Sequence, residues 1–328
     1  MEMVTYVKSD LSKVEPIVPA VNDIVINLMR KDKRVVFIGA DTVYQTITPE
    51  QLKIINSEFP DRLINVGIAE AQACQLASGM ADRGMIPYWG EVSAGQWLFM
   101  RAYNQIKQCI ATDRRNVKML GTQGISPASG PSHQAIEDLA AIRAYPGIMI
   151  VAPADVVEAK KATLASYKYY GPVMIRYDRS ANTIFEESYP FELGKAFTVR
   201  DGKDLTIIGM QTYVGMGMQV ADILAKEGVQ TRVINMSTIK PLDEEAVLKA
   251  AKETGGIVTA ETASILGGLG EAVAATVCEN EPVPIKRIGM RDRFGQSGRD
   301  MNRLLADYNL TVGDMVAAAR DVLKRKKK

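Results

Sequence analysis

Histidine and cysteine are scarce in this chain of 328 residues, which has one histidine, His133, and three cysteines, Cys74, Cys109 and Cys278. The cysteines lack CxxC or other metal-ligand spacing and are too few for a disulfide framework. The sequence therefore argues against a cysteine metal site and against a disulfide framework, and it suits a reducing compartment. Any metal centre or catalytic triad that uses histidine has to be built around His133 alone.

Several motifs of other protein classes are also missing. The sequence contains no GxxxxGK[ST], HExxH or GxSxG pattern, no apolar N-terminal segment and no run of transmembrane length. The segment GGLG at 267–270 lacks the GxGxxG form and predicts a tight helix entry rather than a phosphate turn. The net charge of +2 is exceeded by the five positive charges of the C-terminal KRKKK, so the body of the chain is slightly acidic. We therefore expect a cytoplasmic protein that binds neither nucleic acid nor membranes.

Short β-branched runs alternate with longer helical patterns along most of the chain. Runs such as VVFI at 35–38 and IMIV at 148–151 are typical of parallel strands buried on both faces. This repetition predicts an α/β fold with parallel sheets covered by helices. A polar, Pro-containing connection interrupts the pattern at 178–195. We therefore predict two domains, residues 1–188 and 189–328, each a mostly parallel sheet flanked by helices.

The stretch RLINVGIAEAQACQLASGMADRG at 62–84 predicts a short strand followed by a helix that begins at Glu70. A carboxylate in a first helical turn is ordinarily explained by the helix dipole. The Ala, Ser and Gly residues that follow leave little side chain to fill a core, so another backbone is expected to approach this helix closely. A subunit interface is one candidate, and it would bury Glu70 beside a partner.

His133 lies in SGPSHQ, a Gly/Pro/Ser loop that follows a predicted buried strand. Loops at the carboxyl ends of parallel strands are where α/β proteins bind ligands. A histidine there suits a hydrogen bond to a substrate oxygen or a proton transfer, with a structural histidine as the alternative.

The segments RLINVGIAEAQ, RAYNQI, GPSHQAIEDLAAIRAYPGIMIVAPAD, TRVINMSTIKPLD and RIGMRDRFGQSG occur in this order and resemble the C-terminal half of a transketolase. The resemblance extends over nearly the whole chain. It is greatest to the smaller subunit of a split transketolase, and the matching half of deoxyxylulose-phosphate synthase is also similar. It implies a pyrimidine-binding domain followed by a transketolase C-terminal domain, with thiamine diphosphate as the cofactor. The family's GDG motif for Mg²⁺ and diphosphate is absent from the sequence. The resemblance therefore implies an N-terminal partner subunit that holds Mg²⁺, in an α2β2 assembly around a homodimer core.

The resemblance also implies roles for individual residues. Glu70 would activate the aminopyrimidine of the cofactor, and His133 would contact oxygens of the donor sugar. The cofactor-binding residues implied by the motif match are Asp41, Glu70, Trp97, Phe99 and Tyr103, with Trp97 and Phe99 as alternatives for stacking on the pyrimidine. The substrate contacts implied are Arg101, Ser129, His133 and Arg179, the arginines for a sugar phosphate.

Three departures from the family pattern leave the sugar pair open. Ser129 stands where the family commonly has an aspartate, and Thr122-Gln123 and Ala263 stand near positions that commonly hold histidine. The leading hypothesis is transfer of a two-carbon ketol unit from a ketose (phosphate) donor to an aldose acceptor. The alternatives are a decarboxylating subunit, similar to deoxyxylulose-phosphate synthase or to the beta subunit of a 2-oxoacid dehydrogenase, and a non-catalytic regulatory subunit.

Overall fold

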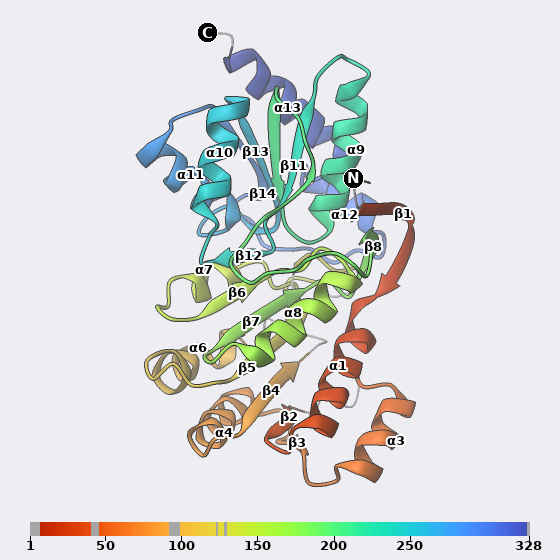
Figure 1. Cartoon of the computed structure of the whole chain (residues 1–328), viewed down its shortest axis with the longest axis vertical. Coiled ribbons are helices and arrows are strands. Elements are labelled where there is room, and N and C mark those ends of the chain that lie inside the picture. Colours follow the sequence, from red (N-terminus) through yellow and green to blue (C-terminus); the bar gives the residue numbers. More distant parts are fainter. Residues whose placement is uncertain (1–6, 41–45, 92–98, 123, 128–129, 327–328) are drawn as a thin grey trace.

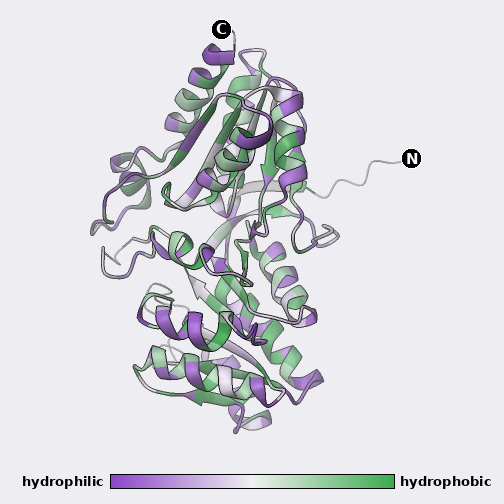
Figure 2. Cartoon of the chain, turned by 90° about the vertical axis from the view of Figure 1, so that its left-hand side faces the viewer, coloured by the Kyte–Doolittle hydropathy of each residue, from purple (hydrophilic) through white to green (hydrophobic). Residues whose placement is uncertain are grey.

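The computed structural model describes residues 7–40, 46–91, 99–122, 124–127 and 130–326. Two sheets lie one above the other along the long axis of the molecule, with helices on their faces (Figure 1). The strands are mostly apolar and the helices turn hydrophilic faces outward (Figure 2). The predicted α/β fold with two mostly parallel sheets is confirmed.

The first sheet has seven strands in the order β12-β6-β7-β5-β4-β2-β3, all parallel except β12, which runs antiparallel to β6. Its strands are β2 (Val35–Gly39), β3 (Leu63–Asn65), β4 (Ile86–Glu91), β5 (Lys118–Thr122), β6 (Met149–Val151), β7 (Val173–Tyr177) and β12 (Thr238–Lys240). The helices of this half are α1 (Ile17–Lys31), α3 (Pro49–Glu58), α4 (Glu70–Asp82), α6 (Tyr103–Gln105), the π-helical η1 (Ile106–Ala111), α7 (Asp138–Arg143) and α8 (Val156–Lys168).

The second sheet has five strands in the order β14-β13-β10-β11-β9, and only β9 is antiparallel to its neighbour. Its strands are β9 (Phe197–Arg200), β10 (Leu205–Gly209), β11 (Thr231–Asn235), β13 (Ile257–Ser264) and β14 (Ile285–Met290). The helices of this half are α9 (Thr212–Ala225), α10 (Glu244–Thr254), α11 (Leu269–Asn280), α12 (Met301–Asp307) and α13 (Val312–Lys326).

Local sequence signals account for where several helices begin and end. Thr48 and Gln51 form a capping box at the start of α3, in which each side chain pairs with the backbone of the other residue. Asp155 caps α8, because its Oδ1 accepts from the backbone N–H of Glu158 at 2.8 Å. Helix α10 ends at Gly255, whose φ of 62° lies in the left-handed region that glycine adopts without a steric penalty.

Two features of the fold were not expected. Strands β1 (Val7–Pro16) and β8 (Ser180–Phe185) pair as an antiparallel ribbon, so part of the segment predicted as a polar connection is a strand. Strand β12 comes from the second half of the chain but pairs with β6 of the first sheet. Both pairings join segments far apart in sequence, and no local pattern reports them. The division at residue 188 stays a prediction.

Among the described residues, no helix has both the length and the apolar character needed to span a bilayer.

Candidate functional site

The predicted site residues all come after strands of the first sheet along the chain. Strand β2 lies between β3 and β4, so the connection from β2 to β3 and the connection from β3 to β4 run in opposite directions across the sheet. Ligands of open α/β sheets bind at such a switch point, outside the carboxyl ends of the strands. Along the chain, Asp41 follows β2, Glu70 follows β3, Trp97, Phe99, Arg101 and Tyr103 follow β4, Ser129 and His133 follow β5, and Arg179 follows β7. Of these residues, Asp41, Trp97 and Ser129 lie outside the part that the structure describes.

Glu70 is the first residue of α4, and its side chain is only 5 % exposed. Its Oε1 accepts a hydrogen bond of 2.7 Å from Nη1 of Arg101. Among the described residues, its Oε2 has no hydrogen-bond partner. The helix N-terminus favours a carboxylate here. Because Oε2 keeps its capacity to accept a hydrogen bond, the site is compatible with a protonated ring nitrogen there.

The residues after β4 serve different purposes. Arg101 is 47 % exposed and contacts Glu70, and the substrate contact that the resemblance implied for it stays a prediction. Phe99 is fully buried in the core. Tyr103 stacks on Tyr145, with ring centroids 4.7 Å apart, and its carbonyl oxygen accepts from the Tyr145 hydroxyl at 3.1 Å. The roles of Phe99 and Tyr103 toward a cofactor stay predictions.

His133 is half-buried in the loop between β5 and α7. Its backbone N–H donates to the carbonyl of Gly130 at 3.3 Å, and its Nδ1 lies 2.7 Å from Oγ of Ser132. When the Ser132 hydroxyl donates to Nδ1, the ring carries its proton on Nε2, which can then donate to a substrate oxygen. Arg179 is exposed just after β7, and its carbonyl oxygen accepts from the backbone N–H of Ile17 at 3.0 Å.

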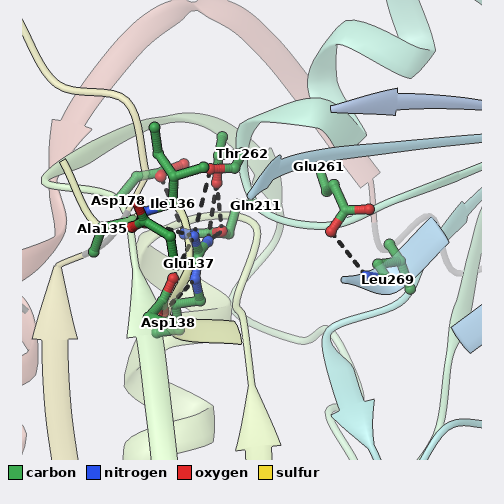
Figure 3. Close-up of polar contacts among 10 residues, drawn as sticks. Ala135, Ile136, Glu137, Asp138, Asp178, Gln211, Glu261, Thr262 and Leu269 are labelled. Atoms are coloured by element: carbon green, nitrogen blue, oxygen red, sulfur yellow. Dashed lines mark hydrogen bonds and ion pairs between the residues drawn. The ribbon is translucent and has the colours of Figure 1, made fainter. Parts of the chain in front are cut away.

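Asp178 and Glu261 are carboxylates with raised pKa values that were not predicted from the sequence. Burial raises the pKa of Asp178 to about 6; its oxygens accept from Nε2 of Gln211 at 3.0 Å and from the backbone N–H of Thr212 at 3.2 Å. Burial raises the pKa of Glu261 to about 7; its two oxygens accept from the backbone N–H groups of Leu269 and Gly270, each at 2.8 Å. Figure 3 shows the contact of Glu261 with Leu269. The GGLG segment is thus a helix entry capped by the protein's own carboxylate.

The described residues contain no group of three His, Cys, Asp or Glu side chains that is able to hold a metal ion. The signal that would have exposed a further polar cluster is Arg176, a charged residue inside the apolar strand VMIRY. Arginine is almost never fully buried without partners. A cluster of hydrogen-bonding groups around Arg176 follows from the sequence by this rule, although their identity does not.

Two family models cover most of the chain. The model described as the transketolase pyrimidine-binding domain matches residues 17–183, and that of the transketolase C-terminal domain matches residues 194–315. With its two α/β units and the polar edge of the first sheet, the chain belongs to the transketolase family. The predicted resemblance is confirmed, and the family implies thiamine diphosphate as the cofactor.

Similar proteins include subunits of split transketolases. The chain is 37 % identical to the 6-deoxy-6-sulfo-D-fructose transketolase subunit SqwH of a Clostridium species, over 93 % of each chain. It is 34 % identical to one subunit of the apulose-4-phosphate transketolase of Phocaeicola vulgatus, over 92 % of this chain and 96 % of that protein. A solved structure titled "Split gene transketolase, inactive beta4 tetramer" is 34 % identical, with a TM-score of 0.84 over 94 % of this chain and 97 % of that one. The prediction of a transketolase-type transferase subunit is confirmed.

Proposed function

We propose that this chain is the C-terminal subunit of a thiamine-diphosphate-dependent transketolase, which moves a two-carbon ketol unit from a ketose donor to an aldose acceptor. The observation that carries the proposal is Glu70, a buried carboxylate at the entrance of α4 with one oxygen held by Arg101 and the other open to a ligand. A carboxylate in this setting suits the cofactor's pyrimidine, because its second oxygen can accept a hydrogen bond from a protonated ring nitrogen.

When bound, thiamine diphosphate supplies the electron sink that ketol transfer requires. Glu70 would accept a hydrogen bond from the pyrimidine ring nitrogen and exchange a proton with it. A glutamine could hydrogen-bond there but not exchange the proton. Arg101 would keep the carboxylate turned so that Oε2 faces the ring. Asp41, Trp97 or Phe99, and Tyr103 are proposed to surround the cofactor, while the companion subunit holds Mg²⁺ and the diphosphate.

The proposed substrate is a sugar with an anionic end. The two related subunits are named for a sulfonated fructose and for apulose 4-phosphate. Each of these sugars carries an anionic group, a sulfonate or a phosphate. Arg179 is exposed just after β7, and its guanidinium suits a phosphate or sulfonate. His133 would donate to an oxygen of the donor, and Ser129 is proposed to contact its hydroxyl groups. These contacts would orient the ketose carbonyl toward the cofactor.

The proposed assembly is an α2β2 enzyme with a homodimer of this chain at its centre. Gln72, Gln75 and Gly79 lie on one exposed, uncharged face of α4, where the missing side chain of Gly79 allows another backbone to come close. Ile68, two residues before Glu70, is 70 % exposed, so its apolar side chain is available for a partner subunit to cover. The relative titled an inactive tetramer of beta chains supports both self-association and the need for a companion. A cytoplasmic location is also proposed.

The test is to combine the chain with a companion subunit, Mg²⁺ and thiamine diphosphate, and to measure ketol transfer. Xylulose 5-phosphate, 6-deoxy-6-sulfofructose and apulose 4-phosphate serve as donors. Glu70→Gln should lower kcat by at least about 100-fold, in the range of a lost acid–base group. Glu50→Gln is the matched control, since Glu50 is an exposed first-turn carboxylate of α3. Full activity of Glu70→Gln would refute the mechanism.

The same reconstituted enzyme separates the alternatives. Release of CO2 from pyruvate without ketol transfer would indicate a decarboxylating subunit. A regulatory subunit would leave the complex active whether or not Glu70 is replaced, and calorimetry would detect no effect of that replacement on thiamine diphosphate binding.

A further inference from the structure

Arg176 is a charged residue of strand β7, and its guanidinium lies fully buried at the junction of the two halves. Its Nε donates to Oδ2 of Asp138 at 2.9 Å, and its Nη1 donates to Oγ1 of Thr262 at 2.9 Å and also to Oε1 of Gln211. Arg176 and Asp138 belong to the first half, whereas Gln211 and Thr262 belong to the second. We call these four residues the junction cluster. Figure 3 shows Asp138, Gln211 and Thr262 around one point.

The segment that follows His133 is anchored on this junction. The carbonyl oxygen of Ala135 accepts from Nη2 of Arg176 at 3.3 Å. The next carbonyl, of Ile136, accepts from the backbone N–H of Ser264 in β13 at 3.0 Å. Residues two and three positions after His133 are thus held by a buried cation and by a strand of the second half. The position of the His133 loop therefore depends on how the two halves meet.

Gln211 is held in a backbone conformation that side chains rarely adopt, with φ 53° and ψ −140°. Its Oε1 accepts from the Thr262 hydroxyl at 2.9 Å, and its Nε2 donates to Oδ1 of Asp178 at 3.0 Å. Asp178 directly precedes Arg179. The junction cluster is therefore tied to two predicted substrate contacts, His133 on one side and Arg179 on the other.

We propose that the junction cluster positions His133, so that the C-terminal domain sets the geometry of a substrate loop in the other domain. The substrate contact of His133 itself rests on the proposed function. Thr262 is the positioning residue most open to test, because its hydroxyl accepts from Arg176 and donates to Gln211. Without that hydroxyl, the guanidinium loses an acceptor and shifts toward its remaining partners. The carbonyl of Ala135, and with it the loop of His133, moves accordingly.

The first experiment reads the position of His133 directly. His133 is the only histidine of the chain, so its ring signals in an NMR spectrum need no further assignment. Thr262→Val should shift these signals, whereas Thr262→Ser, which keeps the hydroxyl, should restore them. Thr259→Val is the matched control: Thr259 is fully buried on the same strand, and its hydroxyl has no partner among the described residues. Unchanged His133 signals in Thr262→Val would overturn the proposal.

The second experiment uses the reconstituted enzyme and asks whether Thr262 acts through His133. Thr262→Val should raise KM for the donor about tenfold and leave thiamine diphosphate affinity within about twofold, as expected for one lost contact to a charged group. In a His133→Ala background the effect of Thr262→Val should disappear, and effects that multiply would contradict the proposal. If the wild type turns over no donor, the proposed function fails, while the NMR comparison still decides the position of His133.

Discussion

Nη1 of Arg101 lies 2.7 Å from Oε1 of Glu70, and this contact joins the segment after β4 to the first turn of α4. The guanidinium is 47 % exposed and the carboxylate 5 % exposed, so water reaches the pair only from the arginine side. An ion pair this open contributes little to stability. Its effect is to orient a buried carboxylate through one oxygen, and the second oxygen stays able to accept a hydrogen bond from a ligand.

Replacing Arg101 by Met is expected to weaken thiamine diphosphate binding by about three- to tenfold, because Glu70 loses the group that orients it. Calorimetry on the assembled enzyme measures this affinity. Arg179→Met is the comparison and should instead raise KM for an anionic donor, with cofactor affinity unchanged. If Arg101→Met changes only the donor KM, Arg101 contacts substrate, as the sequence predicted, and its contact with Glu70 is incidental.

The raised pKa of the buried Glu158 leads us to expect that the free energy of unfolding depends on pH. Burial raises the pKa of Glu158 from 4.5 to about 7, and its carboxylate accepts from the backbone N–H of Ala154, from Asn235 and from the Tyr189 hydroxyl. The folded state keeps this proton at pH values where the unfolded state releases it. The free energy of unfolding therefore falls as pH rises from about 4.5 to about 7, by up to about 3 kcal/mol for this group.

Glu158→Gln should remove this part of the pH dependence. The Asn235 side chain is able to turn its unpaired Oδ1 toward the new amide, so the variant can remain folded. Urea unfolding at pH 5 and pH 8, at fixed protein concentration, gives the two free energies. The pKa of Glu261 is raised in the same direction, so Glu261 preserves part of the pH dependence of the unfolding free energy in Glu158→Gln. If the free energy of unfolding fell as steeply with pH in Glu158→Gln as in an exposed Glu50→Gln control, Glu158 would not be the source of the pH dependence.

Gly79 tests the predicted contact surface on α4. A Cβ at Gly79 would meet no heavy atom within 4 Å, and the residue is exposed. Gly79→Ala should therefore stabilise the isolated chain by up to about 1 kcal/mol through helix propensity. The longer Gly79→Gln should fold equally well but weaken assembly, since close packing of a partner excludes its side chain.

Sedimentation with and without the companion subunit measures that assembly. Ser57→Gln, on the exposed part of α3, adds similar bulk away from the predicted surface and should not change it. If Gly79→Gln assembled as well as the wild type, this face of α4 would not be part of the interface.

The sequence was sufficient for features that local physics determines. Continuous apolar runs such as Val35–Gly39 became buried parallel strands, and the predicted site residues follow these strands along the chain. The contact of Glu70 with Arg101 was not predictable, because it joins residues 31 positions apart on two separate helical segments. The pairing of β1 with β8 escaped for the same reason. Such contacts depend on how elements dock, which periodicity does not encode.

A substitution in the segment FGQSG at 294–298 tests whether the second half of the chain fixes the position of the His133 loop. A Cβ at Gly295 would lie 1.8 Å from Oε1 of Gln134, whose buried Nε2 donates to the carbonyl of Ser126 at 2.9 Å. Gly295→Ala must therefore displace Gln134, the neighbour of His133. We expect stability to fall by about 1–3 kcal/mol and kcat/KM to fall about tenfold or more, because small displacements of positioning groups are costly. Urea unfolding and donor kinetics measure the two effects. Gly313→Ala is the control, since its nearest contact would be an ordinary 3.5 Å. Equal kinetics in the two variants would show that the loop adjusts without loss.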